Sequence, residues 1–224
     1  MDYYLKRKIL QLFYPSRCPI CDEIICHSDR FCSGCRDKLT EYKGNFQVKA
    51  ASSFTAAFIY DENVLPAISL LKNGICGNAD YALGGELADL LNSNGVSEKI
   101  DIIIPVPVHF STKAKRTYNQ SELIAKIVSD ALELPICTDV IIKNRITDDQ
   151  KKLNRISRTI NLKNAFTVVL PELIKEKEVL LIDDICTTGS TLAELTSLML
   201  ENGAKSVHCA VCCKTPLKKT KPES

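Results

Sequence analysis

Residues 179–191, VLLIDDICTTGST, constrain the fold of this chain more than any other stretch. The first four residues are apolar and mostly branched, which is typical of a strand buried on both faces of a parallel sheet. Two carboxylates, Asp183 and Asp184, follow at the carboxyl end of this strand, where open α/β sheets bind their ligands. A small, hydroxyl-rich turn and leucines at helical spacing come next. This order predicts an α/β fold with a ligand site at the turn.

The turn after the acid pair suits a phosphate group. A loop of this kind exposes backbone N–H groups at a helix N-terminus, where the helix dipole favours an anion. The paired aspartates suit the hydroxyls of a sugar, so a sugar phosphate is the expected ligand. An ordinary strand, turn and capped helix is the alternative interpretation, because the same residues favour turns and N-caps. The residues of the turn are Thr187, Thr188, Gly189, Ser190 and Thr191.

The same stretch resembles the phosphoribosyl-pyrophosphate (PRPP) motif of type I phosphoribosyltransferases. That motif consists of a hydrophobic strand, an acidic pair and a TTGST turn. One position departs from it, since Cys186 stands where those enzymes usually carry an aliphatic residue.

The composition is that of a globular protein. Of 224 residues, 45% are hydrophobic and 25% are charged, and the net charge of +2 predicts no strong attraction to nucleic acid. No stretch approaches about eighteen apolar residues, so no transmembrane segment is expected. Lys6, Arg7 and Lys8 interrupt the apolar N-terminus, so we expect no signal peptide. Eleven cysteines without an export signal indicate a reducing compartment, and we expect a cytoplasmic location.

Two Cys-x-x-Cys pairs near the N-terminus predict a structural zinc site. Each pair lets two thiolates bind one ion from a single turn, and two pairs complete the tetrahedral four-sulfur shell that Zn²⁺ prefers. Because the module is small, it buries little apolar surface, and bound zinc would supply its folding energy. Cys26 and His27 offer a competing ligand set, and buried or disulfide-linked thiols are a further alternative. The expected ligands are Cys18, Cys21, Cys32 and Cys35.

The composition changes after Gly44, and we place a domain boundary near residue 48. Residues 1–48 would form an N-terminal helix, over residues 3–13, and the zinc module. Residues 49–224 would form the α/β domain, in which apolar runs predict strands and amphipathic periods predict helices. The expected strands cover residues 54–60, 100–108, 137–143, 179–182 and 207–213, and the expected helices cover residues 64–72, 81–91, 123–131 and 192–199.

Positive charge collects between residues 111 and 165, where eleven Lys and Arg stand against six Asp and Glu. A basic loop follows the Pro-Val-Pro unit that ends the 100–108 strand, since such a unit cannot continue a central strand. Residues 144–164 are polar and basic without a hydrophobic period, which is typical of a disordered segment or a functional lid. A cationic lid would neutralise a departing anion and exclude water. Lys72, at the end of the expected 64–72 helix, would either reach toward the ligand or, as is commoner for such a lysine, lie in solvent.

The chain as a whole resembles the ComF family, whose members are competence-associated, type I phosphoribosyltransferase-like proteins with an N-terminal four-cysteine zinc module. The resemblance rests on the zinc pairs, the Pro-Val-Pro unit, RTYNQ at residues 116–120, an Arg-Gln-Arg-Asn pattern in residues 145–161 and the TTGST turn. Thr117 departs from the glycine that the family usually carries. The resemblance implies a parallel sheet flanked by helices, preceded by the zinc module.

The resemblance also implies an activity. PRPP would bind with Mg²⁺, and phosphoribose would pass to an unidentified acceptor as pyrophosphate leaves. Asp183 and Asp184, the catalytic candidates, would hold the ribose hydroxyls directly or through the metal shell. The residues expected to bind PRPP besides this acid pair are Thr187, Thr188, Gly189, Ser190, Thr191, Val108, Lys113, Arg116, Lys151 and Arg158.

A second hypothesis belongs to a different class of function. ComF-type proteins act in natural transformation, so the chain would be a non-catalytic component that binds single-stranded DNA, with competence machinery proteins as partners. The basic residues 111–165 suit a nucleic-acid backbone. The scarcity of aromatic residues in this segment, and the absence of Trp from the chain, count against it.

Overall fold

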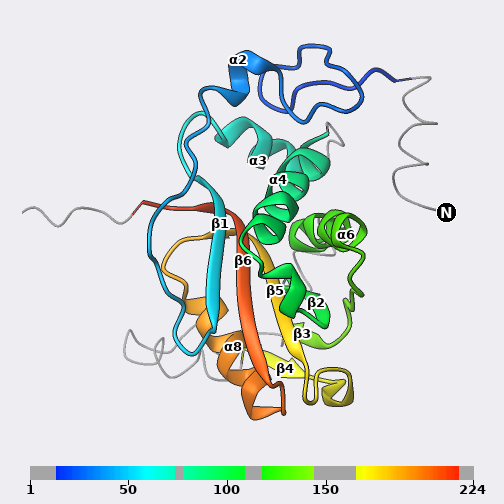
Figure 1. Ribbon diagram of the computed structural model, residues 1–224, viewed down its shortest axis with the longest axis vertical. Coiled ribbons are helices and arrows are strands. Elements are labelled where there is room, and N and C mark those ends of the chain that lie inside the picture. Colours follow the sequence, from blue (N-terminus) through cyan, green and yellow to red (C-terminus); the bar gives the residue numbers. More distant parts are fainter. Residues whose placement is uncertain (1–13, 74–77, 109–117, 144–164, 217–224) are drawn as a thin grey trace, which may run out of the picture.

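The computed structural model describes residues 14–73, 78–108, 118–143 and 165–216. In this part of the chain, a four-stranded sheet with the order β1-β6-β5-β2 forms the centre of the molecule (Figure 1). All of its neighbouring strands are parallel, so their carboxyl ends meet at one edge. The strands are β1 (Ser53–Ile59), β2 (Ile102–Pro105), β5 (Glu178–Cys186) and β6 (Ser206–Lys214).

Strand β5 lies between β6 and β2, and its first half is buried on both faces. Val179 and Ile182 are both 0% exposed, which confirms the buried parallel strand predicted from the apolar run. The strand is longer than expected, because its ladder with β6 continues past the acid pair to Cys186. Asp183 and Asp184 therefore lie within the last four residues of the strand, where the sheet holds their backbone rigid.

Helices cover both faces of the sheet (Figure 1). Alternate residues of the central strands enter different cores, as the two-residue period of a strand requires. Leu180 and Ile103 pack with α3, α4 and α6 on one face, whereas Leu181 and Ile104 pack with α8 on the other. The expected helices are confirmed as α3 (Leu65–Asn73), α4 (Ala79–Ser93), α6 (Gln120–Leu132) and α8 (Ser190–Glu201).

Two expected strands are shorter than the sequence indicates. The strand expected over residues 100–108 is β2, which covers only Ile102–Pro105. In residues 137–143, strand β3 covers only Ile141–Lys143, and it pairs antiparallel with β4 (Phe166–Val168). The preceding residues bend away after a single parallel bridge between Ile136 and Ile103. Short 3₁₀ turns precede β2 and β5, as η1 (Ser97–Lys99) and η4 (Pro171–Leu173).

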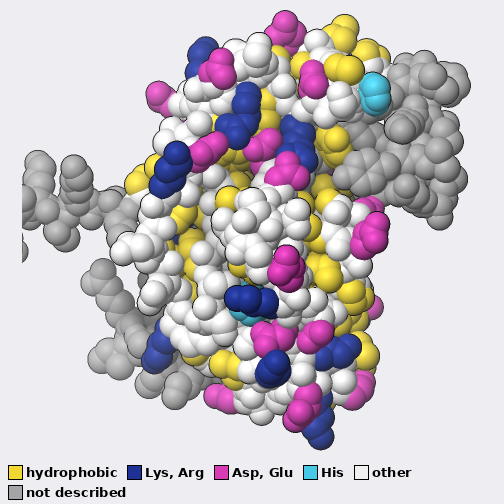
Figure 2. Space-filling view, in the orientation of Figure 1, with side chains coloured by type: hydrophobic (Ala, Val, Ile, Leu, Met, Phe, Trp, Pro, Cys, Tyr) yellow, Lys and Arg dark blue, Asp and Glu magenta, His cyan; other side chains and the backbone are white. Residues whose placement is uncertain are grey.

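The N-terminal module packs directly on the α/β domain. It contains a turn closed by a bridge between Arg17 and Ile24 and a short helix, α2 (Ser33–Arg36). Its Phe31 and Leu39 belong to the same apolar core as α4 and β1. On the surface of the molecule seen in Figure 2, Lys and Arg side chains alternate with Asp and Glu side chains. The ion pairs that join the module to α4 are Arg30–Asp89, Arg30–Glu86 and Arg36–Glu86.

Several expectations fall on residues outside the described part of the chain. They are the helix over residues 3–13, the lid over residues 144–164, and the PRPP-binding roles of Lys113, Arg116, Lys151 and Arg158. Among the described helices, none has the length and apolar character needed to cross a bilayer.

Candidate functional site

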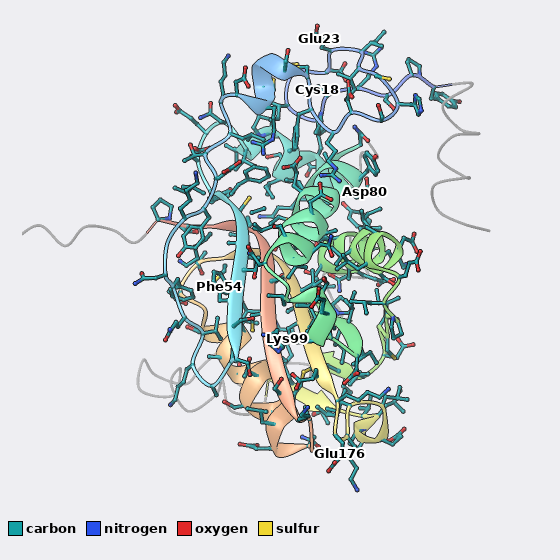
Figure 3. All side chains as sticks on the ribbon, in the orientation of Figure 1. Cys18, Glu23, Phe54, Asp80, Lys99 and Glu176 are labelled. Carbon is teal, nitrogen blue, oxygen red and sulfur yellow. The ribbon has the colours of Figure 1, made fainter. Side chains whose placement is uncertain are left out.

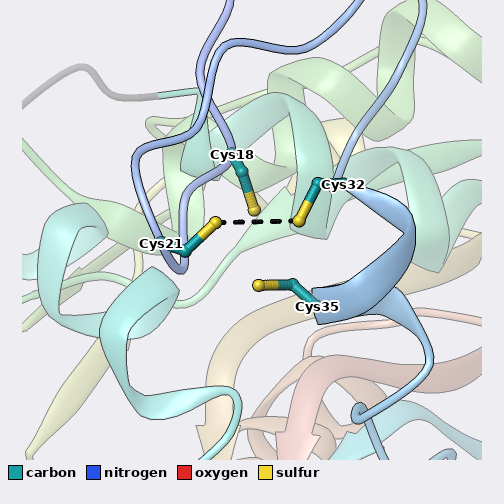
Figure 4. A group of neighbouring side chains, drawn as sticks. All are labelled: Cys18, Cys21, Cys32 and Cys35. Carbon is teal, nitrogen blue, oxygen red and sulfur yellow. Dashed lines mark hydrogen bonds between the residues drawn. The ribbon is translucent and has the colours of Figure 1, made fainter.

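The four cysteines of the two Cys-x-x-Cys pairs meet at one point of the N-terminal module. Cys18 and Cys21 lie in the turn between the bridged residues Arg17 and Ile24. Cys32 directly precedes α2, and Cys35 lies within it. Their Sγ atoms all lie within 4.8 Å of one another, and Cys21 Sγ lies 3.6 Å from Cys32 Sγ. Figure 4 shows the four side chains pointing toward a common centre.

This arrangement fits a tetrahedral zinc ion. With Zn–S bonds of about 2.3 Å, neighbouring sulfurs of a tetrahedron lie about 3.8 Å apart. Burial, followed by the side-chain hydrogen bond with Cys21, raises the pKa of Cys35 well above its ordinary value. Cys26 and His27 lie outside the four-cysteine group in the described structure, with Cys26 Sγ 3.6 Å from His27 Nδ1. The four-cysteine prediction is thus preferred over the competing set.

The acid pair of β5 lies against two helices. The Ser121 hydroxyl of α6 donates to Asp183 Oδ1 at 2.8 Å. Burial, reinforced by the neighbouring Asp184, raises the pKa of Asp183 to about 7. Asp184 accepts from the N–H of Ile185 at 2.8 Å, and its Oδ2 lies 4.0 Å from Lys72 Nζ. Two neighbouring carboxylates suit a divalent cation, because its charge offsets theirs. They also suit sugar hydroxyls, because the hydroxyls can donate hydrogen bonds to the carboxylate oxygens.

Lys72 is closer to the site than its sequence indicates. Sequence alone favours solvent for a lysine at the end of a helix, yet its side chain is only 37% exposed and reaches Asp184. The Tyr118 hydroxyl donates to the Lys72 carbonyl at 2.7 Å, which joins the end of α3 to the start of α6. This contact between distant segments, which no local pattern encodes, lies beside the approach of Lys72 to the acid pair.

Residues 187–191, which we call the phosphate loop, connect β5 to α8. Thr187, Thr188, Ser190 and Thr191 are exposed at the helix N-terminus. The Thr188 and Ser190 hydroxyls lie 2.7 Å apart, so both groups face one small volume. Gly189 has a φ of 79°, in the left-handed region, and a Cβ there would lie 2.8 Å from Phe46 Cζ. Glycine is therefore required both by the backbone and by the adjacent ring.

The start of α6 completes this end of the sheet. The Asn119 side chain caps α6 by accepting from Ser121 N–H at 3.1 Å, and it donates to the Val106 carbonyl at 2.9 Å. Val106 N–H in turn donates to the Ile182 carbonyl at 2.8 Å. Val108 is half-buried two residues further on. The structure therefore brings Val108, the acid pair and the phosphate loop to the same edge of the sheet.

Three neighbours of this site escaped the sequence analysis. Ser121 lies inside an amphipathic helix and shows no local signal of its contact with Asp183. Phe46 belongs to the segment between the zinc module and β1. Lys214 lies one residue beyond the strand expected over residues 207–213, yet it is the last residue of β6 and is 1% exposed. The signal that was available for Lys214 is its place directly after the apolar run of β6.

These features define a phosphoribosyltransferase-like α/β domain preceded by a four-cysteine zinc module. The comparisons agree with this class. Residues 81–224 match the family model of the phosphoribosyl transferase domain, and residues 9–57 match that of the double zinc ribbon domain. The chain belongs to the phosphoribosyl transferase domain family and, with its zinc module and the relatives described next, to the ComF family.

Curated relatives share the chain's sequence to a moderate degree. DNA utilization protein YhgH of Escherichia coli O157:H7 is 37% identical over 51% of this chain and 50% of its own length. Competence protein F of Haemophilus influenzae is 33% identical over 48% of each chain. The YhgH protein of Salmonella typhimurium is 29% identical over 89% of this chain and 85% of its own. The first of these alignments thus spans about half the length of the curated relative.

Proposed function

We propose that this chain binds PRPP with Mg²⁺ at the carboxyl end of β5. The observation that carries the proposal is the convergence of a closely held acid pair and an open, hydroxyl-lined loop at a helix N-terminus. The phosphate loop would take the 5′-phosphate through N–H groups and the hydroxyls of Thr188 and Ser190. Asp183 and Asp184 would take the ribose hydroxyls, and Val108 would lie on the pyrophosphate side.

Phosphoribose transfer would follow from the same geometry. A nitrogen nucleophile of an unidentified acceptor would displace pyrophosphate at the anomeric carbon. The chain's own groups would act by positioning the sugar and by neutralising charge, since no nucleophilic side chain is needed for such a displacement. Mg²⁺, held through the acid pair and ligand oxygens, would supply charge neutralisation at the pyrophosphate. Lys72 would give up its contact with Asp184 when the cation binds.

The biological setting is proposed from the names of the relatives. "Competence protein F" and "DNA utilization protein" describe proteins with roles in competence and in the use of DNA. We propose a related, cytoplasmic role for this chain, with competence machinery proteins as partners. Direct binding of single-stranded DNA depends on basic residues of which most lie outside the described part of the chain, and no contact among the described residues favours it.

The acid pair gives the sharpest test of the proposal. The double variant Asp183→Asn with Asp184→Asn should fold and keep its zinc but lose Mg²⁺-dependent PRPP binding in isothermal titration calorimetry. Glu172→Gln is the matched control, because it removes an exposed carboxylate in the turn before β5, at the opposite end of that strand. Retained PRPP affinity in the double variant would remove the acid pair from the site.

A further inference from the structure

Lys214 is a buried lysine beside the phosphate loop. Lysine is rarely buried unless paired, yet Lys214 is only 1% exposed. Its Nζ donates to the carbonyl oxygens of Thr187 at 2.7 Å and Thr215 at 2.9 Å. The same Nζ lies 4.4 Å from the centre of the Phe46 ring. The ammonium group therefore lies against the backbone that begins the phosphate loop.

The charge of Lys214 has no opposite charge at hand. Within the described residues, no carboxylate lies at ion-pair distance from its Nζ. A buried charge without a partner is costly, and two carbonyls and an aromatic ring compensate only part of that cost. An anion bound in the adjacent loop would compensate the rest.

The hydrogen bond from Lys214 also orients the peptide that joins Thr187 to Thr188. In a trans peptide, the carbonyl and the following N–H point in opposite directions. Because the Thr187 carbonyl points at Lys214, the Thr188 N–H points away from it. That N–H has no acceptor among the described residues. It is thus a free donor held in place beside the N-terminus of α8, where an anion would use it.

Phe46 covers the same loop from the segment that follows the zinc module. Its ring contacts Gly189 so closely that a Cβ would not fit. The ring lies 5.0 Å from the Phe54 ring of β1, a residue labelled in Figure 3, and the Phe46 N–H donates to the Tyr42 hydroxyl at 3.1 Å. Phe46 therefore shields Lys214 from water, which strengthens the field of the ammonium in the loop.

We propose that Lys214 is a positioning residue for an anion in the phosphate loop, which it serves by fixing the 187–188 peptide and by placing a shielded positive charge behind it. This inference rests on the proposed function, since it takes the 5′-phosphate of PRPP as that anion. Lys214 does not touch the ligand; it acts through the loop backbone and through its field.

The test uses the zinc-loaded full chain and two probes, PRPP with Mg²⁺ and ribose 5-phosphate, which carries the 5′-phosphate but no pyrophosphate. Lys214→Met and Lys214→Gln remove the charge, and Lys214→Arg keeps it. Both neutral variants should bind both probes at least about tenfold more weakly, as expected for loss of a charge-assisted interaction. Lys214→Arg should stay within about threefold of the wild type. Lys205→Met, an exposed lysine at the opposite end of β6, is the control and should leave affinity unchanged.

The outcomes separate this inference from the proposed function. If the wild type binds neither probe, the proposed function itself is wrong. If the wild type binds but the neutral variants bind equally well, Lys214 is only structural, and a lowered melting temperature would be its sole effect. Weakened PRPP binding with unchanged ribose 5-phosphate binding would also overturn the inference. Lys214→Gln keeps donors for both carbonyls, so it decides the question if Lys214→Met does not fold.

Discussion

Asp183 is the residue whose protonation couples the site to stability. Its pKa of about 7 in the folded chain lies above the value of about 3.9 expected for the unfolded chain. Between these values the folded state binds the extra proton, so this group makes the protein less stable as pH rises. The contribution is complete below pH 4 and lost above pH 7.

The Asp183→Asn variant tests this shift. The free energy of unfolding of the wild type, relative to that of the variant, should fall by about 2.5 kcal/mol between pH 5 and pH 8. Urea unfolding of the wild type and the variant at the two pH values measures the difference. A difference independent of pH would mean that Asp183 titrates normally.

Gly189 has a left-handed backbone and lies directly against the Phe46 ring. Gly189→Ala must accept a left-handed backbone, which costs about 1 kcal/mol, and must also displace Phe46. Gly95→Ala is the matched control, because Gly95 has a φ of 64° with open space around it. We expect Gly189→Ala to lower the free energy of unfolding by about 1 to 2 kcal/mol more than Gly95→Ala does. Equal costs in urea unfolding would show that Phe46 does not pack on the loop.

Residues of the site differ in how far the sequence could predict them. The acid pair and the TTGST turn are contiguous and follow one buried strand, so local pattern was enough to place them together. Ser121, Lys72 and Lys214 reach the site from three other elements. Their contacts depend on how α3, α6 and β6 pack, and no periodicity in the sequence encodes this packing.

At the scale of elements, the capped start of α6 links the helix to the acid pair. Asn119→Ala removes both the cap on Ser121 N–H and the donor to the Val106 carbonyl, and it should cost about 2 kcal/mol of stability. Asn119→Asp keeps the cap but loses the donor, so it should cost less. Chemical denaturation of the three proteins measures the order, and a neutral Asn119→Ala would contradict this role.

Strands and helices of the sheet were predictable because their periods are strong. Continuous burial along β5, β2 and β6 follows from their apolar runs, and the buried faces of α4 and α6 follow from helical spacing of apolar residues. The first and last residues of these elements were harder to predict from the sequence. Strand β5 continues through two acidic residues because β6 pairs with it there, and β3 is short because the chain before it bends after one bridge.

At the scale of the molecule, the zinc module and the α/β domain share one apolar core. Cys18, Cys35, Phe31 and Leu39 belong to the same cluster as Phe58 of β1. We still propose a boundary near residue 48, but as a point in the sequence and not as a break in the core. Loss of the metal should therefore affect the whole molecule.

Cys18→Ser and Cys35→Ser should each release zinc and lower the melting temperature of the entire chain in a single transition. Cys26→Ser is the control and should keep both its zinc and its stability, since Cys26 lies outside the four-cysteine group. Metal content by atomic emission and scanning calorimetry provide the two measurements. Unchanged zinc in either ligand variant would rule out the assignment, and two separate transitions would contradict a shared core.

Calorimetric titration of the zinc-loaded wild type with PRPP, in the presence and absence of Mg²⁺, tests the proposed PRPP site most directly. The acid pair and the phosphate loop predict Mg²⁺-dependent binding of PRPP with a Kd of about 1 to 100 μM. Absence of binding at millimolar PRPP by a folded, zinc-loaded protein would contradict a PRPP site here, and the loop would then be only a strand-to-helix connection.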